Sequence, residues 1–123
     1  MNLRIEGGRP FQMKEANIYI AEFEELVLLA ILKLGSNAYG ATIHEALEGT
    51  GRRVTIGALY TTLSRLEGKG LVSSWMGEST IRRGGRAKKY FKVRATGARA
   101  LRAAESARRK LLPRPTFAFG GAE

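Results

Sequence analysis

The apolar positions of the sequence follow helical spacing in the first half of the chain. Residues Glu22–Leu34 carry apolar side chains at three- and four-residue intervals, which predicts an amphipathic helix. Further leucines widen this stripe until little polar face remains. We therefore expect the helix to be buried on several sides, either at the centre of the domain or partly against a second subunit.

Two shorter apolar stripes predict a second and a third helix. The second covers about residues 39–47, with Ser36 or Asn37 as its N-cap, and the third covers about 56–69, with Thr55 as its N-cap. The inner face of the third helix is expected to consist of Ile56, Leu59, Tyr60, Leu63 and Leu66, and its outer face of Thr61, Thr62, Arg65 and Lys69.

After the third helix the apolar period changes from 3.6 to 2. Residues 71–76 and 88–94 are predicted strands, joined by a Gly- and Arg-rich loop over 77–86. A last helix follows over 96–112, capped by Thr96, with a thin alanine-rich stripe that needs another element to pack against. The expected fold class is mainly α with a small β-hairpin: a winged helix-turn-helix of three helices, a two-stranded wing and a C-terminal helix.

This order of elements also predicts the domain organisation. We expect an N-terminal arm over residues 1–20, a winged-helix domain over 21–95, a C-terminal dimerisation helix over 96–112 and a flexible tail over 113–123. The length of 123 residues fits a single domain.

Charge separates the two halves of the chain. Residues 15–51 hold six Glu and one Lys, whereas residues 52–110 hold 16 Lys and Arg and three Glu, within a total net charge of +10. Such clustering favours a polyanionic partner over a surface that is basic only for solubility.

The chain has no Cys, which excludes disulfides and thiolate metal sites. It also has no apolar run long enough for a membrane span, so we expect a cytoplasmic protein that does not bind membranes.

The predicted helix-turn-helix makes DNA the expected ligand of these basic residues. A recognition helix enters a major groove about 12 Å wide, so its outer residues should be small or should donate hydrogen bonds. Ala58, Thr61, Thr62 and Arg65 meet that need, and cations of the wing suit phosphates or a narrow minor groove. Backbone amides at the starts of the second and third helices can bind phosphate as well.

Four stretches of the sequence resemble the PadR family of bacterial winged-helix transcriptional regulators. They are residues 24–32 (EELVLLAIL), 38–40 (AYG), 57–72 (GALYTTLSRLEGKGLV) and 84–93 (GGRAKKYFKV), of which the third is the most specific. The resemblance implies a homodimer that binds operator DNA, usually as a repressor, and some members release DNA when a small aromatic effector binds. It departs from the family pattern at Arg94, where a Thr usually follows the wing, and at Ala58, where a Ser is common.

The resemblance and the helix-turn-helix argument together define two sets of candidate residues. The DNA-binding candidates are Tyr39, Thr55, Ala58, Tyr60, Thr61, Thr62, Arg65, Lys69, Arg82, Arg83, Arg86, Lys88 and Lys89. The family dimerises through its C-terminal helix and the partner's first helix, which implies Phe23, Leu26, Val27, Leu101, Ala104, Ala107 and Leu111.

Several alternatives remain open from the sequence. Tyr60 lies on the expected inner face, so it either packs in the core or contacts phosphate, and Trp75 either packs or stacks on a ligand. His44 is the only His and has neither Cys nor Asp as a potential co-ligand, so we expect no metal and no cofactor. The sequence has no Ser-His-acid set, no Cys nucleophile and no G-x-x-x-x-G-K phosphate loop, so we expect no enzymatic activity. A basic RNA-binding or ribosome-associated winged-helix protein is the main alternative, and a protein-interaction module is a weaker one.

Overall fold

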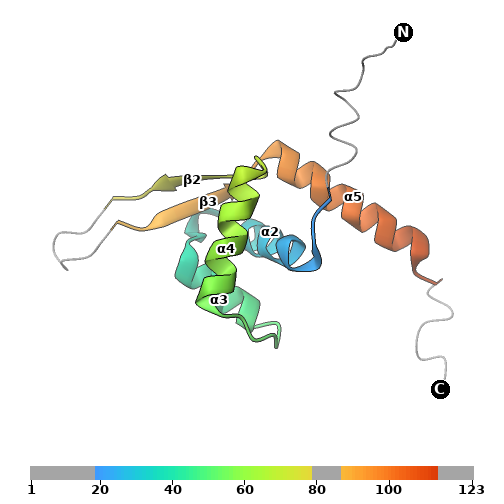
Figure 1. Cartoon of the computed structure of the whole chain (residues 1–123), viewed down its shortest axis with the longest axis horizontal. Helices are drawn as coiled ribbons and strands as arrows, with labels where there is room; N and C mark the ends of the chain where they lie inside the picture. Colours follow the sequence, from blue (N-terminus) through green and yellow to red (C-terminus); the bar gives the residue numbers. More distant parts are fainter. Residues whose placement is uncertain (1–18, 79–86, 114–123) are drawn as a thin grey trace, which may run out of the picture.

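The computed structural model describes residues 19–78 and 87–113 (Figure 1). In chain order the elements are α2 (Glu22–Leu34), the 3₁₀ turn η1 (Gly35–Asn37), α3 (Gly40–Glu48), α4 (Ile56–Gly68), β2 (Val72–Met76), β3 (Lys89–Val93) and α5 (Ala95–Leu111). This is the predicted winged helix-turn-helix. The predicted arm up to residue 18, most of the basic loop and most of the tail lie outside the described residues.

Helix α2 lies at the centre of the fold, as its wide apolar stripe predicts. Val27, Leu28, Ala30 and Ile31 are buried, and the helix packs against α3, α4, β3 and α5 (Figure 1). Each of these elements therefore takes its position from the same helix.

The start of α3 is capped differently from the prediction. The backbone N–H of Tyr39 donates to Oγ1 of Thr42 at 3.0 Å, and that hydroxyl donates in turn to the carbonyl of Asn37 at 2.6 Å. The predicted caps, the side chains of Ser36 and Asn37, are wrong because both residues belong to the intervening turn η1.

Helix α4 begins at the predicted cap, where Oγ1 of Thr55 accepts a hydrogen bond from the N–H of Ala58 at 3.1 Å. The expected faces of this helix are partly wrong. Thr62 is buried, with 4% of its surface exposed, whereas Ile56 and Tyr60 are about half exposed. Thr62 is three residues from Leu59 and four from Leu66, so it shares their buried stripe.

The hairpin packs on the helices through its central aromatic residue. Strands β2 and β3 are antiparallel, with pairing from Val72 opposite Val93 to Met76 opposite Lys89, and Phe91 of β3 is buried. The N–H of Phe91 donates to the carbonyl of Ala38 at 2.9 Å, so the segment before α3 lies along the free edge of β3.

Helix α5 begins at Ala95, with Arg94 at the N-cap position. The predicted cap by Thr96 is wrong because its hydroxyl donates to the carbonyl of Gly70 at 2.5 Å, which ties the helix to the turn after α4. Gly97 is buried directly against the carbonyl of Leu71, and a side chain there would collide with backbone.

We therefore predict that Gly97→Ala destabilises the protein by about 1–3 kcal/mol, because the added methyl overpacks the contact between α5 and the base of the wing. Gly57→Ala is the matched control, since Gly57 is helical, exposed and has open space where a Cβ would lie. That change should be neutral or stabilising by up to about 1 kcal/mol. Urea unfolding followed by circular dichroism measures both, and equal stabilities would contradict the predicted close contact.

Candidate nucleic-acid interface

The outer face of α4 is polar and built from short side chains. Thr61, Ser64 and Arg65 are exposed and, with Tyr60, line a shallow hollow along the helix. Ala58 is also exposed, one turn closer to the N-terminus of α4. A surface of small residues with hydroxyl and guanidinium donors has the form that a helix needs to approach base edges.

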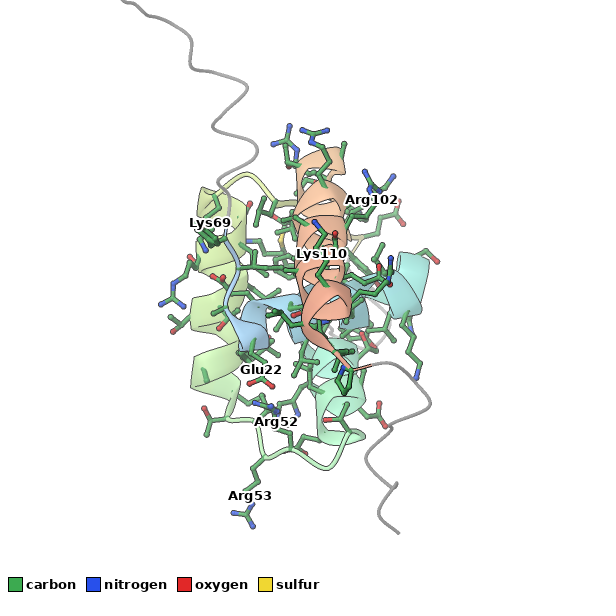
Figure 2. The ribbon with its side chains drawn as sticks, turned by 90° about the vertical axis from the view of Figure 1, so that its right-hand side faces the viewer. Glu22, Arg52, Arg53, Lys69, Arg102 and Lys110 are labelled. Carbon is green, nitrogen blue, oxygen red and sulfur yellow. The ribbon has the colours of Figure 1, made fainter. Side chains whose placement is uncertain are left out.

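The turn before α4 adds a cation that the sequence argument did not select. Arg53 is exposed and points away from the body of the protein (Figure 2). Neighbouring Val54 is buried, and its carbonyl accepts a 2.7 Å hydrogen bond from Nε2 of His44, which fixes the turn to α3. Because a carbonyl only accepts, that ring nitrogen carries a proton. The position of Arg52 and Arg53, three and two residues before the N-cap Thr55 of the recognition helix, was a usable signal.

An aromatic row connects the wing to the start of α3. The Tyr90 ring lies 5.4 Å from the Tyr39 ring, edge to face, and 5.9 Å from the Trp75 ring, stacked. The ammonium of Lys88 lies 4.4 Å from the centre of the Tyr39 ring. The row therefore holds Lys88 of the wing next to the N-terminus of α3.

Tyr60 of α4 also lies next to the start of α3. It is 50% exposed, and its hydroxyl packs so closely on Gly40 that a Cβ there would overlap it. The core interpretation of Tyr60 is therefore wrong. Tyr39, Tyr60 and Lys88 surround the start of α3, where unpaired backbone amides favour an anion.

The remaining described DNA-binding candidates have other contacts within the fold. Thr62 is buried, the ammonium of Lys69 lies 2.9 Å from both carboxylate oxygens of Glu24, and the ammonium of Lys89 lies 3.6 Å from Glu67 of α4. Thr55 is exposed, but its hydroxyl caps α4. Arg82, Arg83 and Arg86 lie outside the described residues.

The dimerisation candidates are also divided by the structure. Val27 and Leu101 are buried within the chain, while Phe23 and Leu26 pack partly against the core. Val27 has no surface to offer a partner. The exposed apolar side chains of α2 are instead Leu29 and Leu32, which line a groove with α5. On α5, Ala104 is half-buried, and Ala107 and Leu111 are exposed.

Trp75 packs within the wing, while its other proposed role, stacking on a ligand, stays a prediction. It stacks on Tyr90, yet about half of its surface is exposed and lines a hollow at the end of α2 with Leu32, Lys92 and Val93. The small aromatic effector that the family resemblance implies stays a prediction.

Within the described ranges, 19–78 and 87–113, no cluster of three or more metal-ligating side chains occurs. Nor does any helix in that part of the chain have the length and apolarity to cross a bilayer. The half-buried His44 ring is used within the fold, through its bond to Val54.

The fold and this surface together define a winged-helix DNA-binding protein. The sequence model of the transcriptional regulator PadR-like family matches residues 28–103, so the chain belongs to that family. It is a PadR-like transcriptional regulator.

Solved structures agree with this assignment. A PadR-like transcription factor from Bacteroides fragilis is 29% identical with a TM-score of 0.62, covering 81% of this chain and 87% of its own. A PadR family regulator from Eggerthella lenta is 29% identical with a TM-score of 0.59, covering 73% and 79%. One from Clostridium difficile, 22% identical with a TM-score of 0.60 and covering 72% and 90%, shares the fold. No curated protein matches the chain.

One carboxylate behind this surface has a shifted pKa. Burial alone would raise the pKa of Glu24, but hydrogen bonds from Lys69 and from the N–H of Ala21, together with the charges of Lys69 and Arg65, lower it below its ordinary value of 4.5. A carboxylate whose pKa is lowered by folding stabilises the folded state above the unfolded pKa. That stabilisation is lost as the pH falls through the lowered value.

We therefore predict that Glu24→Gln lowers the free energy of unfolding at neutral pH by about 1–3 kcal/mol. The difference from the wild type should shrink as the pH falls below the ordinary carboxyl range. Denaturant unfolding of both proteins over a pH series measures this, because the remaining carboxylates titrate in both. A difference that stays constant through the acid range would contradict the role of the ionised pair.

Proposed function

We propose that the protein is a homodimeric repressor that binds a palindromic operator with the outer face of α4. Residues Thr61, Ser64 and Arg65 contact bases, while Arg53 and Lys88 contact phosphates. The observation that carries the proposal is the single surface formed by the exposed face of α4, the start of α3 and Lys88, which directly precedes strand β3 of the wing.

Electrostatics support DNA as the ligand of this surface. Among the described residues, neither Arg53 nor Arg65 has an ion-pair partner, in contrast to Arg52, which lies 3.0 Å from Glu22. Exposed cations without an ion-pair partner, close to small polar residues, favour contact with phosphates.

The groove between α2 and α5 supports a second copy of the chain as partner. Leu29 is 45% exposed and Leu32 is 53% exposed, and the groove also holds Glu105 and Arg102. A twofold interface repeats each of these residues, so an apolar strip meets its own copy and rim charges of both signs can pair. Two recognition helices would then lie about 34 Å apart, one turn of DNA.

Repression follows from steric exclusion of RNA polymerase when the operator overlaps a promoter.

The alternative function, RNA binding, is supported by the aromatic row beside Lys88, because unpaired bases stack on exposed rings. Trp75 is the exposed ring of that row, whereas Tyr39 and Tyr90 are half-buried. A single exposed ring gives less stacking surface than sequence-specific RNA-binding modules use, so duplex DNA is the favoured ligand.

The test is fluorescence anisotropy with a duplex from the gene's own upstream region, a scrambled duplex and RNA, at two salt concentrations. We expect tight, salt-dependent binding to the upstream duplex. Arg65→Ala should cost about 1–3 kcal/mol on that duplex and relax the sequence preference, whereas Arg53→Ala should weaken both duplexes equally and reduce the salt slope by about 1. Equal binding of the wild type to both duplexes, or a preference for RNA, would overturn the proposal.

The dimer makes a separate prediction. Leu29→Gln with Leu32→Gln should weaken self-association at least about tenfold, because apolar surface at an interface core becomes polar. Ile56→Gln is the control, since Ile56 is an equally exposed apolar residue on α4, away from this groove. Sedimentation velocity without DNA measures both variants. Unchanged association of the double variant would place the interface elsewhere.

A further inference from the structure

Two consecutive glutamates in the first turn of α2 bind two different helices. Both carboxylate oxygens of Glu24 lie 2.9 Å from the ammonium of Lys69, the residue that follows α4. The carboxylate of Glu25 lies 2.5 Å from the guanidinium of Arg108 on α5. One helical turn therefore connects the end of the recognition helix to the helix that we assign to dimerisation.

Burial separates these two pairs from a third nearby. The side chains of Glu24 and Glu25 are 4% and 11% exposed, whereas that of Glu22, which meets Arg52, is 73% exposed. An exposed pair contributes little to stability or geometry, since water and salt screen it. Figure 2 shows the difference in place: Arg52 and Glu22 meet near the start of α4, while Lys69 lies at its other end.

The two ends of α4 are held by different polar contacts. At its start, Thr55 caps the helix and His44 fixes the preceding turn. At its end, the buried pair of Lys69 with Glu24 is joined by the contacts of Glu67 with Ser74 and Lys89 of the wing, by the hydrogen bond of Thr96 to the carbonyl of Gly70, and by a 3.5 Å contact of Lys69 with the carbonyl of Tyr19. Glu24 also accepts a hydrogen bond from the N–H of Ala21 at 2.8 Å, so the carboxylate is held from two sides.

We propose that Glu24 is a positioning residue for the recognition helix, and that Glu24 and Glu25 together couple the placement of α5 to that of α4. The inference rests on the proposed function, because it assumes that α4 reads DNA and that α5 lies at the dimer interface. It assigns to Lys69 the role of an anchor rather than a DNA contact.

The two roles for Lys69 predict opposite effects of Glu24→Gln. If Lys69 contacted phosphate, loss of the Glu24 charge would free the lysine and strengthen DNA binding. If Lys69 anchors α4, the same variant lets the end of the helix move and weakens binding to the preferred duplex. Removal of a negative charge cannot by itself weaken binding to a polyanion, so the sign is diagnostic.

The experiment compares Glu24→Gln with Glu22→Gln, which removes the same charge from the exposed pair. Anisotropy is measured on the upstream and scrambled duplexes, well below the unfolding midpoint of each variant. We expect Glu24→Gln to lose about tenfold in affinity for the upstream duplex, with no loss on the scrambled one, and Glu22→Gln to lose nothing. Lys69→Met should lose the same affinity for the upstream duplex as Glu24→Gln, whereas Lys69→Arg, which keeps the charge, should bind it like the wild type. Unchanged or tighter specific binding by Glu24→Gln would overturn the inference.

Coupling to α5 is tested with Arg108→Gln at concentrations where sedimentation shows it to be dimeric. We expect the same loss of specificity although Arg108 lies on α5, outside the surface of α4. Normal specificity in a dimeric Arg108→Gln would remove the coupling.

A measurement without DNA keeps the inference testable whatever the wild type binds. Amide hydrogen exchange in Glu24→Gln should accelerate in the last turn of α4, with the first turn unchanged. Unchanged exchange in the last turn would overturn the positioning role even if the wild type discriminates between duplexes. A wild type that does not discriminate would instead remove the proposed function, while faster exchange would still support the anchor.

Discussion

Burial of the apolar stripe of α2 is the interaction on which the other elements depend. Val27, Leu28 and Ile31 are almost completely enclosed by side chains from α3, α4, β3 and α5. A domain of this size has one small core, so packing on a single central helix positions all four elements relative to one another. The cost of this arrangement is that α2 has little freedom to vary, because a change on any side disturbs a different neighbour.

The acidic residues of α2 lie at its start. Glu22, Glu24 and Glu25 fall in the first turn, near the positive end of the helix dipole, where carboxylates are favoured. Each of those carboxylates meets a cation from a part of the chain that is distant in sequence: Arg52, Lys69 and Arg108 are 30, 45 and 83 residues away. The acidic first half and the basic second half of the sequence are thus partly neutralised against each other inside one scaffold.

Local patterns predicted the elements well and the side-chain environments less well. The bounds of α2 and the Thr55 cap of α4 are confirmed, because helical period and N-cap chemistry are both short-range signals. The prediction that Thr62 lies on the outer face was wrong, because its spacing from Leu59 and Leu66 determines its face and its polar side chain does not. A threonine in register with Leu59 and Leu66 can bury its methyl, while Tyr60 keeps its ring at the surface against Gly40. The ion pairs could not be predicted, since no local pattern states which helix lies beside the first turn of α2.

Net charge is therefore a poor measure of the surface offered to a polyanion. Lys69, Lys89 and Arg108 each lie beside a glutamate, so their charges serve the scaffold first. Arg53, Arg65 and Lys88 form no ion pair among the described residues, although the charge of Arg65 acts on Glu24, and all three border the exposed face of α4 or the start of α3. A cation that is already paired releases fewer counterions on binding than an unpaired one, because its field is partly cancelled before the phosphate arrives. The pairing of individual cations, as well as the total charge of +10, therefore determines how strongly each of them attracts a phosphate.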